Sequence, residues 1–327
     1  MRGRGPGPGG SGSLPGSDGG LLVVGDVATD VVARHRSPLA RGTDTTADIR
    51  LLPGGAGANA ACWAVRWGCA DVRLLARVGT DARAWHEASL RDSGVRARLV
   101  VDDEVPTATV ISLVDASAER TFLTDSGASV RLTADDWSPS LLDGVGRLHL
   151  SGYLYFSEAG RGAVAAALAS ARERGVAVSV DPASVAFIEE LGVARFLAET
   201  EGAETLLPNA DEARLLTGLA DVEKAAAALS RLGRVAVVTL GEAGAVVAEA
   251  GEVTARVPPV ATRAVDSTGA GDAFTGAYLA ARLAGADPPG AAKEGCRAGA
   301  AAVTRAGGRP GAGPGRGQGP GLGREER

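Results

Sequence analysis

Short apolar runs that are typical of β-strands alternate with alanine-rich helical runs along most of this chain. Repeated alternation of this kind predicts a parallel sheet that is covered by helices on both faces. The predicted strands lie at 21–25, 72–78, 147–150, 176–180, 204–207, 234–240, 246–249 and 253–257. The predicted helices lie at 58–67, 79–90, 162–174, 222–232, 273–284 and 291–305. Ligands of such sheets bind beyond the carboxyl ends of the strands, so the loops there are the first place to look for a site.

A β-rich pair of segments interrupts this alternation. Residues 106–113 and 120–124 are joined by the polar turn 115–119, and they alternate like a sheet with one solvent-facing side. We expect this hairpin to belong to a small separate sheet, to which residues 31–52 could contribute further strands. The expected fold class is therefore α/β, with a doubly wound, mostly parallel sheet flanked by helices and a small β-sheet beside it.

Composition sets the limits of the folded part. The chain has 327 residues, of which 45% are hydrophobic, and this is enough for one large α/β domain or two smaller ones. Residues 1–20 and 308–327 are rich in Gly and Pro, and we predict that both are disordered tails, because they cannot bury enough apolar surface to offset the entropy lost on ordering. The folded domain is expected at 21–307.

The same composition argues against several classes of partner. The net charge of −5 argues against a nucleic-acid-binding protein. No apolar run reaches the ~18 residues that a membrane span needs. The N-terminus lacks the apolar core of a secretory signal, and Cys62, Cys69 and Cys296 lack the spacing of metal ligands. These features predict a cytoplasmic protein whose cysteines are free thiols.

The stretch Asp266–Phe274 combines a glycine turn with a carboxylate. A β-type run at 255–265 is expected before it, and a helix is expected after it. Gly269 and Gly271 would leave backbone N–H groups uncovered at the start of that helix, where the helix dipole favours an anion. With Asp272 at the mouth of such a site, the stretch suggests phosphoryl transfer to a hydroxyl group. An Asp that merely caps the helix is an equally good interpretation of this stretch taken alone.

Lysine is scarce, since only Lys224 and Lys293 occur. Neither stands in the G-x-x-x-x-G-K-[ST] pattern of a P-loop, and their polar or alanine-rich surroundings make both poor candidates for a Schiff-base lysine. Any phosphate would therefore be bound by backbone amides and arginines. The three histidines have no triad-like spacing, so hydrolysis by a Ser/His/Asp triad has little support.

A second glycine loop matches the pattern G-x-G-x-x-A at Gly55, Gly57 and Ala60, with Asp81 downstream. This pattern is similar to the dinucleotide-binding fingerprint, but a lone motif of this kind is weak. We expect Asp81 to cap a helix rather than to bind a ribose. Asn59, at the start of the next helix, could instead present its amide to a polar ligand.

Several of the predicted loops lie at the same edge of the sheet and carry polar residues in a fixed order. The segments are Gly25 to Asp30, Gly54–Asn59, Pro208–Glu212, Thr239–Gly241 and Asp266–Phe274. This order is similar to that of the ribokinase-like (PfkB-type) family of carbohydrate and nucleoside kinases, over about residues 21–310. The last motif is specific to that family, and its combination with the others argues against a chance match.

The resemblance implies a role for each matching residue. Asp272 matches the base that takes the proton from the substrate hydroxyl, and the loop Gly269, Ala270 and Gly271, with the amide of Asp272, matches the anion hole that stabilises charge on the transferred phosphoryl group. The positions that match those holding sugar hydroxyls are Asp30, Gly54, Gly55 and Asn59. The positions that match the ATP-binding loop are Thr239, Gly241 and Gly244, and those that match a Mg²⁺ motif acting largely through water are Asn209 and Glu212.

The resemblance also implies a monovalent cation, expected to be K⁺, as an activator beside the anion hole. The matching positions are Asp266, Thr268, Ala302, Arg305, Gly307 and Gly311. The β-rich segments at 31–52 and 106–124 match a β-sheet lid that covers the sugar and often serves for dimerisation.

The leading hypothesis is an ATP-dependent kinase that phosphorylates a hydroxymethyl group of a sugar or sugar-like substrate. An alternative on the same fold is a nucleoside kinase of the adenosine or pseudouridine type, since Tyr153, Phe156 and two tryptophans could stack on a base. A remote alternative is an NAD-binding oxidoreductase, which would leave Asp266–Phe274 unexplained. The sequence does not name the substrate, whose selection we assign to the lid and to the loop at 151–156.

Overall fold

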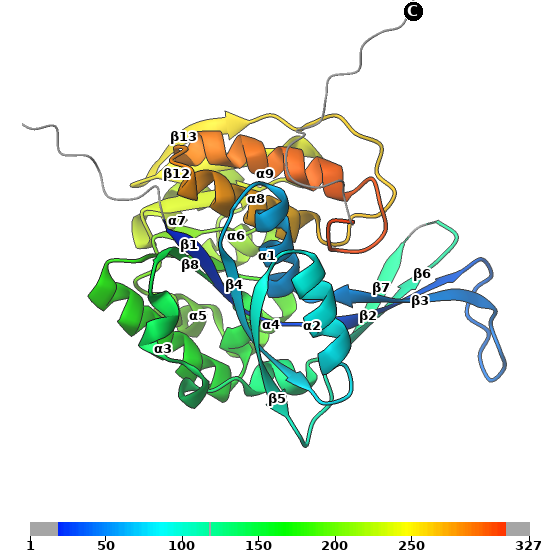
Figure 1. Ribbon diagram of the computed structural model, residues 1–327. Coiled ribbons are helices and arrows are strands. Elements are labelled where there is room, and N and C mark those ends of the chain that lie inside the picture. The colour runs from blue at the N-terminus through cyan, green and yellow to red at the C-terminus, as the bar shows by residue number, and fades with distance from the viewer. Residues whose placement is uncertain (1–18, 118, 312–327) are drawn as a thin grey trace, which may run out of the picture.

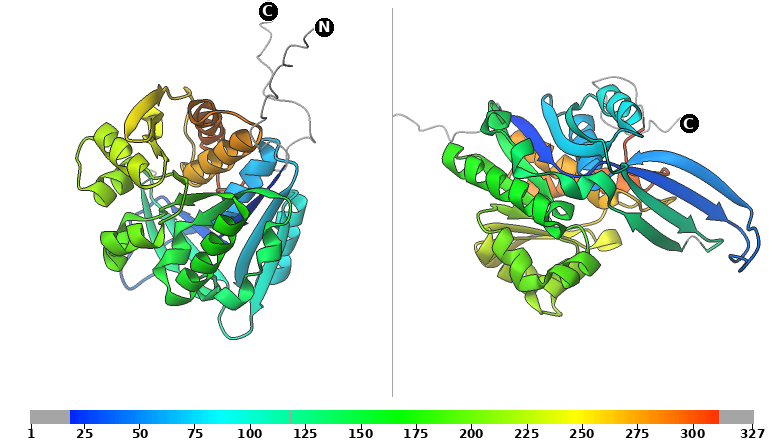
Figure 2. Two further views of the ribbon diagram at one scale, coloured as in Figure 1. Left: turned by 90° about the vertical axis from the view of Figure 1, so that its left-hand side faces the viewer. Right: turned by 90° about the horizontal axis from the view of Figure 1, so that it is seen from below.

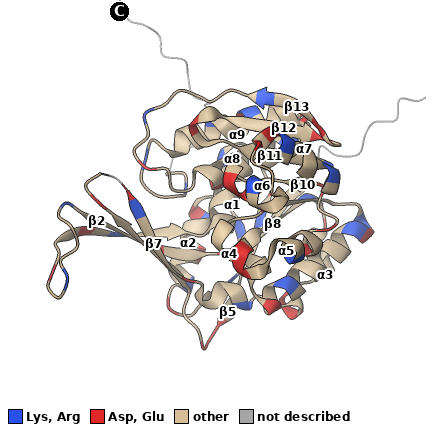
Figure 3. Ribbon diagram, turned by 180° about the vertical axis from the view of Figure 1, so that it is seen from behind, with Lys and Arg blue, Asp and Glu red and all other residues tan. Residues whose placement is uncertain are grey.

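The computed structural model describes residues 19–117 and 119–311. A large sheet with helices on both faces forms the main body, and a small second sheet extends away from one side of it (Figures 1 and 2). Basic and acidic residues are interspersed over the helices of the main body (Figure 3). Within the described residues, no helix is both long and apolar enough to pass through a membrane.

The main sheet has nine strands in the described part of the chain, in the order β13-β12-β11-β10-β9-β8-β1-β4-β5. Neighbouring strands from β11 to β5 are parallel, whereas β12 and β13 form an antiparallel edge. The strands are β1 (Gly20–Val24), β4 (Val72–Gly79), β5 (Arg96–Asp102), β8 (Val145–Ser151), β9 (Ala177–Asp181), β10 (Thr205–Leu206), β11 (Val235–Thr239), β12 (Ala245–Glu249) and β13 (Glu252–Val257). The predicted α/β fold with a mostly parallel sheet is confirmed.

Helices cover both faces of this sheet. They are α1 (Ala56–Arg66), α2 (Arg83–Asp92), α3 (Glu158–Arg174), α4 (Val185–Leu191), α5 (Val193–Glu199), α6 (Ala210–Thr217), α7 (Val222–Leu232), α8 (Ala270–Leu283) and α9 (Pro288–Ala302). In β1, Leu22 and Val24 pack on the side of α3 to α7, whereas Leu21 and Val23 pack on the side of α1, α2, α8 and α9. Successive side chains of a strand point to opposite faces, so a strand buried on both sides requires a continuous apolar run.

The second sheet has the strand order β3-β2-β6-β7 in the described residues, and we call it the lid. Its strands are β2 (Ala28–His35), β3 (Ala47–Gly54), β6 (Ala108–Val114) and β7 (Arg120–Asp125). Strands β2 and β6 are parallel in its centre, and the outer strands are antiparallel to them. The predicted hairpin and the predicted contribution of residues 31–52 are therefore confirmed, with bounds that shift by up to three residues.

Some helices and strands were not predicted from the sequence. Strand β5 and helices α4, α5 and α6 were not predicted, and these helices are only seven or eight residues long. Such short helices are too brief for periodicity to identify, and packing of residues such as Phe196 stabilises them. The predicted β-type run at 255–265 is wrong beyond Val257, because Pro258 and Pro259 have no N–H group to donate to a neighbouring strand.

The predicted cap role of Asp81 is also wrong. Helix α2 begins at Arg83 with Ala82 as its N-cap. The Asp81 carboxylate instead accepts hydrogen bonds of 2.9 Å from both the backbone N–H and the hydroxyl of Thr107. It therefore ties the end of β4 to the segment that enters the lid.

Both predicted domain limits shift slightly. Gly20 belongs to β1, and at the other end Gly308 and Arg309 are buried rather than part of a tail. The Trp63 indole donates a 2.8 Å hydrogen bond to the Gly308 carbonyl, and Arg309 donates to the Gly54 carbonyl. The rest of the two predicted tails, residues 1–18 and 312–327, lies outside the described residues.

Candidate active site

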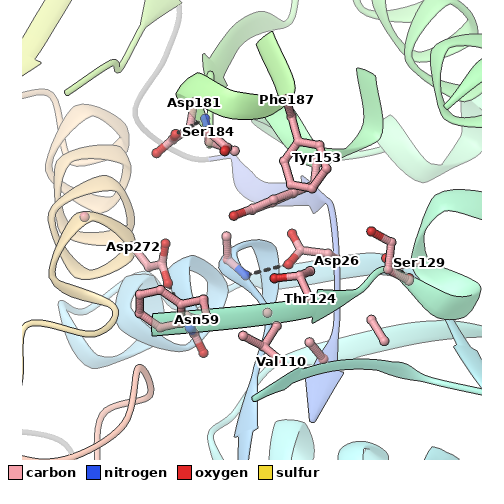
Figure 4. A pocket seen from close by; sticks show the side chains of 18 of the residues that line it. Asp26, Asn59, Val110, Thr124, Ser129, Tyr153, Asp181, Ser184, Phe187 and Asp272 are labelled. Carbon is pink, nitrogen blue, oxygen red and sulfur yellow. Dashed lines mark hydrogen bonds between the residues drawn. The ribbon is translucent and has the colours of Figure 1, made fainter. Parts of the chain in front are cut away.

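A cavity of about 440 Å³ opens at the carboxyl ends of the main-sheet strands, where the lid forms its other wall (Figure 4). The predicted site residues that line it are Asp30, Gly55, Asn59, Asn209, Glu212, Thr239, Gly271 and Asp272. In Figure 4, Val110 and Thr124 of the lid face the same space as Asp181 and Asp272 of the main body. The structure therefore brings residues from five separate sequence motifs to one cavity.

The glycine turn before α8 forms one end of this cavity. Gly269 is the N-cap of α8 and has φ of +73°, and a Cβ there would collide with the backbone of Gly308, so only glycine fits. At Gly271 a Cβ would meet no atom within 4 Å, so the first turn of the helix is open to the cavity. The N–H groups of that turn have no partner inside the helix, although Ala270 donates a long bond of 3.3 Å to the Ser267 carbonyl.

Asp272 is the third residue of α8 and does not cap it, so the alternative interpretation as a helix cap is wrong. Its Oδ2 accepts a 2.8 Å hydrogen bond from Nδ2 of Asn59 on α1. Burial raises the pKa of Asp272 to about 8. The bond from Asn59 opposes this increase in pKa, whereas the negative charges of Asp181, Asp26 and Asp30 add to it. A carboxylate with a pKa this close to neutral is suited to accept a proton from a hydroxyl.

Asn59 also keeps a free polar atom. Within the described residues its Oδ1 is buried and has no hydrogen-bond partner. A buried acceptor without a partner costs free energy, and a ligand hydroxyl would satisfy it. Asn59 can therefore hold Asp272 with one end of its amide and a substrate hydroxyl with the other.

The start of α1 is fixed by Asp26, which sequence analysis did not assign to the site. Its Oδ2 accepts a 2.7 Å bond from the N–H of Ala56, and its Oδ1 accepts bonds from the N–H of Gly57 and the hydroxyl of Ser151. Gly55, the N-cap of α1, has φ of +93° and lies against the backbone of Asp26. The position of Asp26 directly after β1, at the ligand-binding edge of the sheet, was the signal that could have identified it.

Asp30 lies within lid strand β2, not at the end of a main-sheet strand as predicted. A Cβ on Gly54 would collide with the Asp30 carboxylate, so Gly54 makes room for Asp30 and does not itself line the cavity. Burial raises the pKa of Asp30 to about 7, with a further contribution from the charge of Asp26, while the nearby Arg309 opposes it.

Asn209 and Glu212 form a capping box at the start of α6. The Asn209 side chain accepts bonds from the N–H groups of Asp211 and Glu212, and Glu212 Oε2 accepts a 2.9 Å bond from the Asn209 N–H. Burial raises the pKa of Glu212 to about 8 and that of Asp181 to about 6, and the charge of Asp181 adds to the effect on Glu212. A cation between or near these two carboxylates would relieve their repulsion, so the residues present fit a Mg²⁺ ion held through water.

The predicted ATP loop is the turn between β11 and β12. Thr239 lines the cavity beside Asn209, and its N–H donates to the Pro208 carbonyl. Gly241 and Gly244 do not line it, but both have positive φ, and a Cβ on Gly244 would collide with the Val257 carbonyl. These glycines shape a tight turn immediately next to the cavity.

The residues predicted to bind a monovalent cation are only partly brought together. Asp266 Oδ2 accepts a 3.3 Å bond from the N–H of Gly307, and its Oδ1 accepts one from the N–H of Thr268. Ala302 ends α9, whereas Arg305 is exposed. The Asp266 carboxylate is already paired with Arg120 and Arg34 of the lid, so a K⁺ ion there would have to displace an arginine. The residues present therefore do not fit a monovalent cation.

The cavity wall includes Tyr153, which sequence analysis considered for stacking on a base, and three further residues that it did not assign, Phe122, Asp181 and Phe187. Tyr153, Phe187 and Phe122 supply aromatic surface, and Asp181 accepts a 3.2 Å bond from the Thr275 hydroxyl. Among the described residues, no Lys, Arg or His lines the cavity. Asp181 stands at the end of β9, and this position could have identified it, as for Asp26. Phe122 and Phe187 gave no such signal, because tertiary packing places the lid strand β7 and the short helix α4 that carry them.

Comparison with known proteins places this geometry in a family. The model of the pfkB family carbohydrate kinases matches residues 19–312. Fructokinase-1 of Zea mays is 32% identical over 241 residues, which make up 69% of this chain and 72% of the maize protein. A probable sugar kinase from Rhizobium etli has a TM-score of 0.82 at 22% identity, over 90% of this chain and 96% of that one, which shows a common fold.

The structure of a third relative was solved with ligands bound. A candidate Ribokinase II from Escherichia coli, solved in complex with ATP and Mg²⁺, has a TM-score of 0.78 at 25% identity, over 89% of this chain and 94% of that one. The family match extends over all of the described residues, and the fold agrees with it. The chain belongs to the pfkB family of carbohydrate kinases.

Proposed function

We propose that this kinase transfers the γ-phosphoryl group of ATP to a hydroxymethyl group of a neutral sugar, with Asp272 as the base and the first turn of α8 as the anion hole. The observation that carries this proposal is the shared cavity. Gly271 and Asp272 line the same space as Asp30 and Asn59, so a sugar hydroxyl can reach the base and the anion hole at once.

The steps follow from this arrangement. Asp30 and Asn59 accept hydrogen bonds from sugar hydroxyls and hold the reacting hydroxyl against Asp272. Asp272 takes the proton of that hydroxyl while the hydroxyl oxygen forms a bond to the γ-phosphorus. The bond between the γ-phosphorus and the β–γ bridging oxygen breaks, and ADP leaves with the electron pair of that bond. The open N–H groups at Gly271 and Asp272 stabilise the charge on the transferred group.

Asp181, Glu212 and Asn209 would hold Mg²⁺ on the nucleotide side of the cavity. When bound, this ion neutralises charge on the phosphates. The raised pKa values of Asp181 and Glu212 support a cation at this place, and so does the relative that was solved with ATP and Mg²⁺. Thr239, beside Asn209, would then contact the nucleotide.

The charge of the cavity favours a neutral substrate. Its wall carries the carboxylates Asp26, Asp30, Asp181, Glu212 and Asp272. The described wall holds no basic side chain that could pair with a substrate carboxylate. We expect neutral pentoses or hexoses to be phosphorylated, and sugar acids to have a kcat/KM at least ~100-fold lower, because their charge would be buried unpaired beside like charges.

The test is the rate of ADP release with Mg²⁺ and ATP across a panel of neutral pentoses, neutral hexoses, keto-acid sugars and nucleosides. Turnover of a neutral sugar supports the proposal. Preferential turnover of a keto-acid sugar would refute the charge argument, and no ADP release with any acceptor, together with tight NAD binding, would refute the kinase assignment.

A nucleoside kinase is the second candidate, and the aromatic wall favours it. Tyr153 and Phe187 form an edge-to-face pair with ring centroids 5.9 Å apart, and both line the cavity with Phe122. Phe156 lies behind this pair, stacked on Phe187. A base could stack on these rings, so a nucleoside that outperforms every sugar in the panel would select this candidate.

We also propose that the lid forms a dimer through its outer face. One apolar row crosses the sheet in register through Leu51, Val31, Ile111 and Leu123. Leu51 and Leu123 are 62% and 54% exposed. A continuous apolar row that is exposed in this way is unusual on the surface of a monomer. A second copy of the same face would cover this row symmetrically.

We expect the wild-type protein to be a dimer by light scattering and Leu51→Asp to be a monomer. The control is Arg50→Asp, which places an aspartate one residue away on the opposite face of β3 and should remain dimeric. A monomeric wild-type protein at micromolar concentration would contradict this proposal, as would a Leu51→Asp variant that stays dimeric.

A further inference from the structure

An arginine of the lid occupies the place beside the anion hole where a cation was expected. Arg120, the first residue of β7, pairs with Asp266 at 2.6 Å between Nη2 and Oδ1. Its Nη1 donates to the hydroxyls of Ser267 and Thr268 at 3.1 and 3.0 Å. One guanidinium therefore contacts three consecutive residues immediately before Gly269, the N-cap of α8.

This pair is buried and its charges balance. The Asp266 side chain is 3% exposed and that of Arg120 is 14% exposed. Arg34 of β2 lies 3.8 Å from the other Asp266 oxygen but is 40% exposed, so it contributes less. Burial alone would favour a protonated Asp266, yet the hydrogen bonds from Thr268, the charge of Arg120 and the N–H of Gly307 together keep its pKa below the ordinary value.

We propose that the Arg120 guanidinium replaces a bound monovalent cation beside the anion hole, so that this kinase needs no such ion for activity. This inference rests on the phosphoryl transfer proposed above. A carboxylate that is nearly inaccessible to water requires one compensating charge, and Arg120 supplies it from within the chain. The planar fork of the guanidinium also fixes the two hydroxyls of the turn, which a single ion could not do in the same geometry.

The same contact links the lid to the anion hole. Strand β7 also carries Phe122 and Thr124, which line the cavity. Outward movement of β7 would separate Arg120 from Asp266 and leave the carboxylate before Gly269 without its main partner. Arg120 is therefore a positioning residue, because it acts through the turn and does not itself line the cavity.

The first test compares steady-state rates in KCl and in tetramethylammonium chloride at equal ionic strength. Wild-type rates should agree within about twofold. Arg120→Ala should lower kcat by about tenfold or more in tetramethylammonium with a smaller change in the KM for the sugar, because the turn, not the substrate contacts, is disturbed. K⁺ or guanidinium should restore part of the kcat of this variant. The matched control is Arg50→Ala, which removes an exposed lid arginine paired only with Asp48 and should behave as wild type.

The second test needs no turnover, so it decides this inference even if the proposed function fails. Thermal unfolding of the unliganded wild-type protein should be the same in KCl and tetramethylammonium chloride, whereas Arg120→Ala should be stabilised specifically by KCl. Arg120→Lys keeps the positive charge but lacks the planar guanidinium. This variant should show neither a K⁺-specific increase in thermal stability nor the full wild-type kcat. Several-fold activation of the wild type by K⁺, or a K⁺-specific shift in its unfolding, overturns the inference without any variant. An Arg120→Ala variant with wild-type kcat in tetramethylammonium overturns it as well.

Discussion

Replacing Asp272 with Asn is expected to lower kcat by ~10³-fold or more while the KM for the sugar changes little. The variant keeps the shape of the side chain and its contact with Asn59, so the substrate should still bind. It loses the group that accepts the proton of the attacking hydroxyl. The measurement is ADP release at saturating sugar and ATP, with binding followed separately by calorimetry.

The pH dependence provides a second readout of the same residue. The pKa of Asp272 is raised to about 8 in the unliganded protein, chiefly by burial. The protonated form cannot act as a base, so wild-type kcat/KM should rise with pH, about tenfold per unit below that pKa, and level off above it. In Asp272→Asn this rise should disappear.

Asp103→Asn is the matched control, because Asp103 is exposed and lies outside the cavity. It should keep both the wild-type rate and the wild-type pH profile. If Asp272→Asn turned over near the wild-type rate, Asp272 could not be the base. An unchanged pH profile in that variant would assign the titration to another group.

Gly271→Ala is the second change for which we expect a large effect, a fall in kcat of ~100-fold, because a displacement of about 1 Å at the reacting group can cost that much. The added Cβ would meet no atom from elsewhere in the protein within 4 Å, and because Gly271 lines the cavity we expect it to narrow the space proposed for the phosphoryl group. The free energy of unfolding should stay the same or rise, since Ala is favoured over Gly in a helix by up to ~1 kcal/mol.

Activity and stability should therefore move independently in this variant. Gly162→Ala in α3 is the control, because its Cβ would also find space, with its nearest neighbour at 4.0 Å, but far from the cavity wall. It should be fully active and similarly stable. If Gly271→Ala were fully active, the open first turn of α8 could not be the anion hole.

The glycine loops and Asp272 could be predicted from sequence because each belongs to a short contiguous motif. Gly269 and Gly55 stand at helix N-caps with positive φ, where the local backbone alone demands glycine. Most strands of the main sheet could be predicted for a similar reason, since burial on both faces requires continuous apolar runs, whereas the edge strand β5 has a mixed sequence and was not predicted. In both cases, the information lies within a few neighbouring residues.

The partners of these motifs could not be predicted in the same way. Arg120 is 147 residues from Ser267 in the chain, and nothing in its own neighbourhood marks it as a partner of the anion-hole turn. The monovalent cation expected from the family pattern was inferred from Asp266 and Thr268 without knowledge of what faces them. Only the placement of the lid against the loop before α8 reveals that an arginine is already there.

Two further features depended on tertiary structure. Helices α4 and α5 are short, and burial of Ile188 and Phe196 in the core stabilises them more than their own periodicity does. Asp30 was expected at the end of a main-sheet strand, but β2 belongs to the lid, so Asp30 approaches the cavity from the opposite side. The sugar is therefore expected to lie between Asp30 of the lid and Asn59 of the main body.

The central claim, transfer of a phosphoryl group to a hydroxymethyl group, is tested most directly by phosphorus NMR of the product formed from the best neutral sugar. Our account predicts a phosphomonoester whose phosphorus couples to two methylene protons, formed in step with ADP by the wild type and absent with Asp272→Asn. Coupling to a single proton would place the phosphate on a secondary or anomeric hydroxyl, and inorganic phosphate as the sole product would indicate hydrolysis. Either of these results would contradict the account.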